Sequence, residues 1–78
     1  MEMNLAKESA IVEAVLFLDS EPLTEDAISK ISELSVDVVK LAIEELHKKY
    51  ENENSGVELV QITGGWVLAP KKDIWFSL

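Results

Sequence analysis

The hydrophobic pattern of this chain changes its period once, after the polar segment that ends at Gly56. Up to Tyr50 the apolar residues recur every three or four positions, which is the spacing of a helix face. From Val57 onward they form two short β-rich runs on either side of Gly64-Gly65. A chain of 78 residues has room for one small core. The pattern therefore predicts an α+β domain in which helices come first and a hairpin follows.

The first predicted helix runs from Lys7 to Leu18 and ends before the turn-forming segment Asp19 to Pro22. Its spacing at i, i+3, i+4 and i+7 predicts a core face. That face consists of Ile11, Ala14, Val15 and Leu18. The helix carries further apolar residues on both flanks, so its apolar band is broader than a monomeric surface helix needs.

Two more helices follow, each preceded by a residue that favours an N-cap. Thr24 is expected to cap a short helix that ends near Glu33, and Ser35 is expected to cap a longer one from Val36 to about Glu51. The core side of the longer helix is predicted to consist of Val39, Ala42, Ile43, Leu46 and Tyr50.

The two runs after Gly56 predict strands at Val57–Ile62 and Trp66–Ala69, joined by a tight turn. A turn that needs positive φ would explain both Gly64 and Gly65. Apolar residues fall on both faces of each strand, so the alternation leaves the buried face open. The order of three helices and a hairpin is that of a winged-helix domain, with the hairpin as its wing.

Catalytic and metal chemistry find little support in the residues. There is no cysteine, which excludes disulfides and thiolate chemistry and makes the cytosol the expected compartment. His47 and Glu44 have a spacing that can ligate a metal, but further ligands are not evident. The paired acids are interpreted as solvated charge: Glu25-Asp26, Glu44-Glu45, and Glu51 with Glu53. Thr63-Gly64-Gly65 lacks the following helix of a phosphate loop. We therefore expect no enzyme, no cofactor, no metal and no membrane segment.

Charge argues against nucleic acid, since 15 acidic residues face seven lysines and no arginine, giving a formal net charge of −8. The outward side of the third helix is expected to mix both signs, and residues 57–69 contain no basic side chain. A DNA-binding transcription regulator is nevertheless the alternative hypothesis, because winged-helix domains often place the third helix in the major groove.

The surplus of apolar residues indicates a protein partner, with aromatic residues as the expected anchors. The predicted interface residues lie on the first helix, on the third helix and near the carboxyl end. They are Val12, Leu16, Phe17, Val38, Leu41, Ile74, Trp75 and Phe76.

Two segments resemble the family of segregation and condensation protein B, ScpB. The first is Val12-Glu13-Ala14-Val15-Leu16-Phe17, followed after three residues by Glu21-Pro22-Leu23. The second is Gly56-Val57-Glu58-Leu59-Val60, followed by Gly64-Gly65-Trp66-Val67-Leu68. Asp19-Ser20 departs from the small residue and glycine often found before Glu-Pro-Leu, and Val67 and Ala69 stand where the family often has basic residues.

The resemblance implies that residues 1–78 form a single winged-helix domain, the N-terminal part of a longer two-domain protein. It implies a non-catalytic role in chromosome segregation and condensation, in the cytoplasm and associated with the nucleoid through its complex. The implied partners are a second copy, the kleisin ScpA and, through ScpA, the SMC ATPase. No direct sequence-specific binding of nucleic acid is expected.

Overall fold

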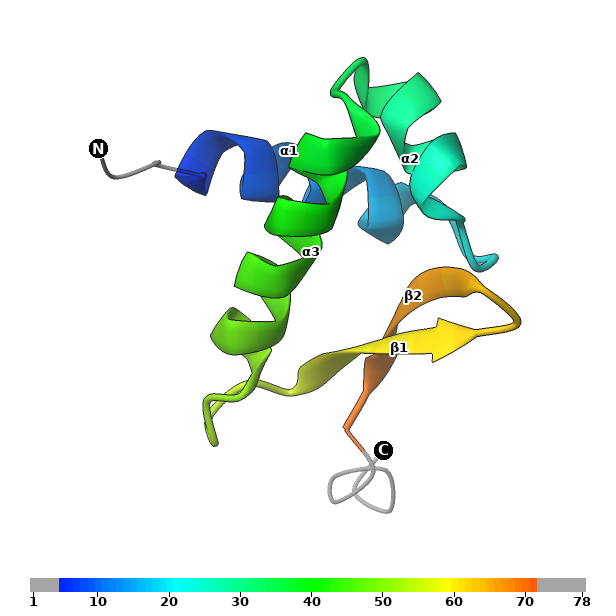
Figure 1. The fold of residues 1–78 in the computed structure, drawn as a ribbon. Coiled ribbons are helices and arrows are strands. Elements are labelled where there is room, and N and C mark those ends of the chain that lie inside the picture. Colours follow the sequence, from blue (N-terminus) through cyan, green and yellow to red (C-terminus); the bar gives the residue numbers. More distant parts are fainter. Residues whose placement is uncertain (1–4, 72–78) are drawn as a thin grey trace.

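A computed structural model describes residues 5–71 and shows three helices followed by an antiparallel hairpin (Figure 1). Helix α1 spans Ala6–Leu18, α2 spans Glu25–Ser32 and α3 spans Val36–Tyr50. Strand β1 spans Val57–Ile62 and β2 spans Gly65–Pro70. The predicted α+β class, the winged-helix order and the extents of the elements are confirmed.

The starts of α2 and α3 are fixed by side-chain caps, as predicted. The Thr24 hydroxyl accepts a hydrogen bond from the Ala27 amide at 3.1 Å, and the Ser35 hydroxyl accepts one from the Val38 amide at 3.2 Å. Each cap satisfies an amide that has no partner within its helix. Between the helices, Glu33 adopts a left-handed backbone with a φ of 64° and donates its amide to the Ser29 carbonyl.

Helix α3 forms the centre of the core, and all five residues of its predicted core side are buried. Helix α1 differs from its prediction. Its buried residues are Val12 and Leu16, at 0% and 3% exposure, whereas Ala14 is exposed and Leu18 is 86% exposed. The predicted core face is therefore wrong for Ala14 and Leu18, whereas Val15 is partly buried against the core and Ile11 is half-buried. Apolar residues lie almost all round this helix, so their spacing admits more than one face.

The hairpin has a two-residue loop, since Ile62 pairs with Gly65 and leaves Thr63 and Gly64 between them. Both loop residues have positive φ, 50° and 81°, as a type I′ turn requires. The register pairs Leu59 with Leu68, and Leu59 is 5% exposed. The buried face that the sequence left open is therefore the one that carries Leu59.

Gly65 is needed for a reason other than the predicted one, because it has no positive φ. A Cβ at this position would lie 2.8 Å from the Pro22 Cβ and 2.9 Å from the Pro22 carbonyl carbon. The neighbouring residues form a bridge: the Leu23 amide donates to the Trp66 carbonyl at 3.0 Å, and the Trp66 amide donates to the Leu23 carbonyl at 2.7 Å. The Glu-Pro-Leu and Gly-Gly-Trp segments thus meet in space and hold the hairpin against the segment after α1.

Candidate protein interface

An apolar groove lies between α1 and the hairpin, with a cavity volume of about 550 Å³. Helix α1 supplies most of its lining, and the end of α3 and the two strands complete it. The lining residues are Ala10, Glu13, Ala14, Phe17, Leu18, Tyr50, Val57 and Leu68. Glu13 is the one charged member of this set, so the groove presents apolar surface to solvent.

Exposed large apolar side chains gather at this groove. Phe17 is 72% exposed, Leu18 is 86% exposed, and Val57 is exposed beside them. Two other exposed apolar residues, Ile31 on α2 and Ile62 on β1, are not part of the groove lining. Contiguous exposed apolar surface of this kind marks sites of protein interaction.

A polar contact between two groove residues, Glu13 and Tyr50, joins α1 to α3. The Tyr50 hydroxyl donates a hydrogen bond to Glu13 Oε2, and Lys49 Nζ lies 2.9 Å from the same oxygen. The bond from Tyr50, with the bond and charge of Lys49, holds the pKa of Glu13 below its ordinary value of 4.5, although partial burial acts in the opposite direction. Burial and the bond to Glu13 raise the pKa of Tyr50 above its ordinary value of 10.0. Glu13 is therefore ionised at neutral pH, with its charge compensated inside the chain.

The structure separates the predicted interface residues into three groups. Val12 and Leu16 are core residues, so the prediction that they form part of an outer surface is wrong: α1 turns them toward α3 and the packed interior. Phe17 is exposed at the groove, and Val38 and Leu41 are half-buried on α3 outside the groove. Ile74, Trp75 and Phe76 lie outside the described residues.

Sequence reasoning missed the other groove residues, above all Ala10, Ala14 and Leu18. Alanine gives a weak pattern signal because it suits a core, a surface and an interface. The helix spacing of α1 places Leu18 on the predicted core face, whereas the structure exposes it. The one sequence feature that could have indicated the groove was the breadth of the apolar band on α1. It predicted that some apolar residues would be exposed, but it did not show which ones.

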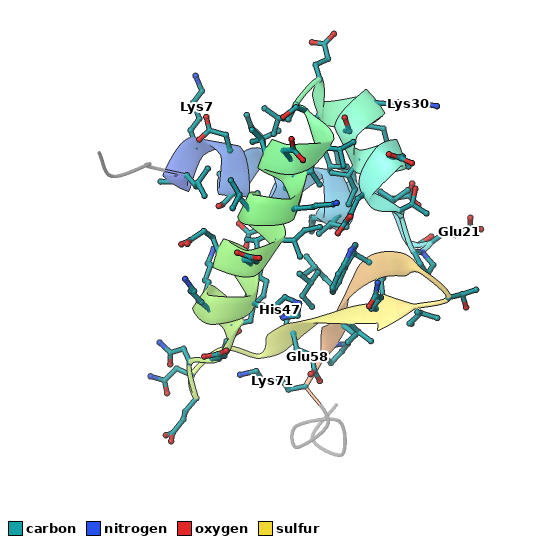
Figure 2. All side chains as sticks on the ribbon, viewed as in Figure 1. Lys7, Glu21, Lys30, His47, Glu58 and Lys71 are labelled. Carbon is teal, nitrogen blue, oxygen red and sulfur yellow. The ribbon has the colours of Figure 1, made fainter. Side chains whose placement is uncertain are left out.

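The polar candidates do not assemble into a catalytic or metal site among residues 5–71. No three His, Asp or Glu side chains in that range come together as a metal site would require. His47 instead packs edge-on against the Trp66 ring, with centroids 5.3 Å apart, and Figure 2 shows it near Glu58 and Lys71. Lys71 Nζ donates to the Asn52 carbonyl oxygen at 2.8 Å.

The surface of α3 mixes charges, as predicted. Lys48 lies 3.6 Å from Glu45, and Lys49 is engaged by Glu13. Phosphate contacts supply most of the affinity of DNA-binding domains, and here acidic side chains compete for two of the lysines that would make them. Within the described part of the chain, no helix is long and apolar enough to cross a membrane.

Comparison with known proteins gives concordant matches. A family model described as segregation and condensation complex subunit ScpB matches residues 10–76. Among curated relatives named segregation and condensation protein B, that of Desulforamulus reducens is 36% identical over 80% of this chain and 34% of its own length. That of Geobacillus kaustophilus is 41% identical over 90% of this chain and 32% of its own length. The chain thus spans about a third of the length of these relatives.

Solved structures share the fold of this chain. A ScpB N-terminal domain, crystallised as a dimer complexed with a ScpA peptide, matches with a TM-score of 0.87 and 37% identity. The match covers 97% of this chain and 90% of that one. ScpB from Mycobacterium tuberculosis matches with a TM-score of 0.80 over 95% of this chain and 46% of its own, at 22% identity.

Proposed function

This chain belongs to the family of segregation and condensation complex subunit ScpB, and on that premise we propose that it is a dimerisation and protein-interaction module. Its role is non-catalytic. It acts in chromosome segregation and condensation with a kleisin of the ScpA type and, through that kleisin, with an SMC ATPase.

One observation carries this proposal: the exposed apolar groove on a domain whose solved relative forms a dimer with a bound ScpA peptide. Phe17 and Leu18 are adjacent, largely exposed and line the same groove, so they form part of a contiguous apolar patch of the kind that marks interaction sites. A second molecule that covers them removes apolar surface from water, which is the main favourable term in protein association.

The chain length relative to the curated relatives supports a domain assignment as part of the same proposal. We assign residues 1–78 to the first winged-helix domain of a longer two-domain protein, because these residues match a third of the relatives' length and 90% of a solved N-terminal domain. Action on the chromosome would place the protein in the cytoplasm, at the nucleoid.

The alternative hypothesis of a DNA-binding transcription regulator receives no comparable support. The described residues of the wing carry no lysine before Lys71, and the α3 lysines are interleaved with acids. The net charge of −8 opposes approach to a phosphate backbone.

Sedimentation equilibrium over a wide concentration range tests the proposal. We expect a reversible dimer that is weakened by Leu18→Glu, because that substitution places a charge at the groove. Ile31→Glu is the matched control, since Ile31 is exposed on α2 and does not line the groove. A wild-type chain that stays monomeric at the highest concentration contradicts dimerisation, and failure to bind a ScpA-type peptide in calorimetry contradicts the partner assignment.

A further inference from the structure

The wing has one covered edge and one open edge. Leu23 bridges Trp66 on the outer side of β2, and Figure 1 shows β2 lying between β1 and the segment before α2. Among the described residues β1 pairs only with β2, so its other side is an edge of the sheet. The edge of a sheet presents backbone N–H and C=O groups that can pair with a further strand.

The hydrogen bonds of the bridge show which backbone groups β1 turns toward the open edge. The amide and the carbonyl of Trp66 both bond to Leu23, so they point away from β1. In an antiparallel pair, opposite residues alternate between those that bond to each other and those that do not. Gln61 faces Trp66, and Leu59 stands two residues before Gln61. The amides and carbonyls of Gln61 and Leu59 therefore point to the open edge, where no described residue bonds to them.

This open edge carries none of the features that keep strand edges from pairing. Natural proteins protect such edges with proline, lysine, bulges or very short strands. Strand β1 has six residues, keeps an unbroken register with β2 from Val57 to Ile62, and contains neither proline nor lysine. Strand β2, in contrast, ends at Pro70 and has Leu23 on its outer side. The edge of β1 is therefore free to accept a strand.

We propose that β1 binds an extended segment of a partner protein, which adds antiparallel to its open edge. Antiparallel pairing is slightly more stable per residue than parallel pairing. In strand addition, main-chain hydrogen bonds supply the affinity and alternate side chains supply the specificity. Leu59 and Gln61 provide the main-chain groups, and neither residue lines the apolar groove. The edge is thus a second interaction surface, beyond the one on which the proposed function rests.

The side chains on the outer face of β1 define which segment fits. Glu58, Val60 and Ile62 lie on the face opposite to the buried Leu59, because successive side chains of a strand alternate. Ile62 is 47% exposed. These three residues stand at the positions of the added pair that do not exchange hydrogen bonds, where side chains of the two strands come closest. The fitting segment places apolar residues beside Ile62 and Val60, and a basic residue beside Glu58.

Charge favours a basic residue at that place. Residues 51–69 include three acids, Glu51, Glu53 and Glu58, and no basic side chain. Glu51 and Glu58 line one cleft, of about 350 Å³, between the end of α3 and β1. Lys71 also lines it, but its ammonium is bonded to the Asn52 carbonyl. A lysine of the added strand therefore meets two carboxylates that form no ion pair with a described side chain.

A synthetic peptide tests the strand addition directly. The probe is the blocked peptide Val-Thr-Val-Thr-Lys-Thr, whose first, third and fifth residues match Ile62, Val60 and Glu58 in antiparallel register. We expect saturable binding with a dissociation constant on the order of 1 mM or below. An NMR titration measures it, and the amide signals of Leu59 and Gln61 should shift most, because their amides gain hydrogen bonds.

Backbone methylation of the peptide separates strand addition from other modes of binding. N-methylation of its second and fourth residues removes the two amides that face Gln61 and Leu59, and should weaken binding by about tenfold or more. N-methylation of its third and fifth residues is the matched control. Those amides point away from β1 in an antiparallel pair, so the dissociation constant should stay within about twofold.

Substitutions in the chain test the same edge from the other side. Gln61→Pro removes an amide that does not bond to β2, so the hairpin is retained and binding should weaken by about tenfold. Gln61→Thr keeps the amide and should bind like the wild type. Glu58→Lys should weaken binding about threefold, and a peptide with glutamate in the fifth place should recover it. Circular dichroism checks that each variant is folded.

The outcomes distinguish this inference from its alternatives. Equal weakening by the two methylated peptides, or wild-type affinity of a folded Gln61→Pro variant, overturns the strand addition. Absence of saturable binding overturns it as well. Self-association that is lost in Gln61→Pro would mean that a second copy occupies the edge, which also overturns it. Leu18→Glu, which alters the groove, should leave binding of this peptide unchanged, so the proposed function and this inference can fail separately.

Discussion

Helices α1 and α3 contain many apolar residues, yet they use them differently. In α3 the buried residues form one side, and every fully exposed position is polar or charged. In α1 the apolar residues divide between a buried side with Val12 and Leu16 and an exposed side with Phe17 and Leu18. The apolar content of a helix therefore does not measure its contribution to the core. The apolar residues of α1 that the core does not use identify a second, exposed apolar surface.

The strongest test of this contrast compares two leucines. Leu46→Ala on α3 removes a side chain that is buried at the centre of the core, and we expect it to cost about 2–5 kcal/mol of unfolding free energy. Leu18→Ala on α1 removes a side chain that is already in water, and we expect a change within about 0.5 kcal/mol. Urea denaturation of dilute protein measures both. Equal losses would contradict the division of α1 into two faces.

Substitution of the glycines in the hairpin is expected to lower the free energy of unfolding by an intermediate amount, because the hairpin there meets the segment after α1. Gly65→Ala places a methyl group against Pro22 and should destabilise the fold by about 2 kcal/mol, because that proline cannot move without breaking the Leu23–Trp66 bridge. Gly64→Ala should cost only about 1 kcal/mol, since it meets open space and has only its positive φ to accommodate.

Thermal or urea unfolding monitored by circular dichroism distinguishes these two glycines. Gly64→Asn is the control for the turn, because asparagine tolerates left-handed backbone better than alanine does. If Gly64→Ala proved the more damaging substitution, the close approach to Pro22 would not be what requires glycine at position 65.

A modest effect on the free energy of unfolding is expected at the polar contact between Tyr50 on α3 and Glu13 on α1. Tyr50→Phe should cost about 1 kcal/mol near neutral pH, because Glu13 loses its hydrogen bond. The pKa of Glu13 is lowered in the folded chain, so this stabilisation is complete above 4.5 and is lost as the pH falls through the folded value. The difference between wild type and Tyr50→Phe should therefore vanish in acid.

Urea midpoints at neutral and acid pH measure this dependence. Glu13→Gln is the matched control, since it removes the titrating group and should show little change over the same acid range. A cost of Tyr50→Phe that stays constant with pH would mean that packing of the phenol, rather than its bond to Glu13, stabilises the contact.

These helices also show what the sequence could predict. The face of α3 was predictable because charged residues mark its outer side without ambiguity. The face of α1 was not, because apolar residues on nearly all sides allow several rotations about its axis, and contacts with α3 decide among them. The Glu13–Tyr50 contact joins residues 37 positions apart, and no local pattern encodes it. The groove depended on both of these features, so the sequence indicated that an interface exists but placed Val12 and Leu16 on it wrongly.

The Leu23–Trp66 bridge makes the opening of the wing measurable by hydrogen exchange. Its two hydrogen bonds join segments far apart in the chain, so closing it costs more loop entropy than forming any single helix. The amides of Leu23 and Trp66 both donate in this bridge, so they exchange with deuterated solvent when the wing separates from the segment after α1. Their protection thus reports that separation, and it should rise in any complex that clamps the wing against this segment.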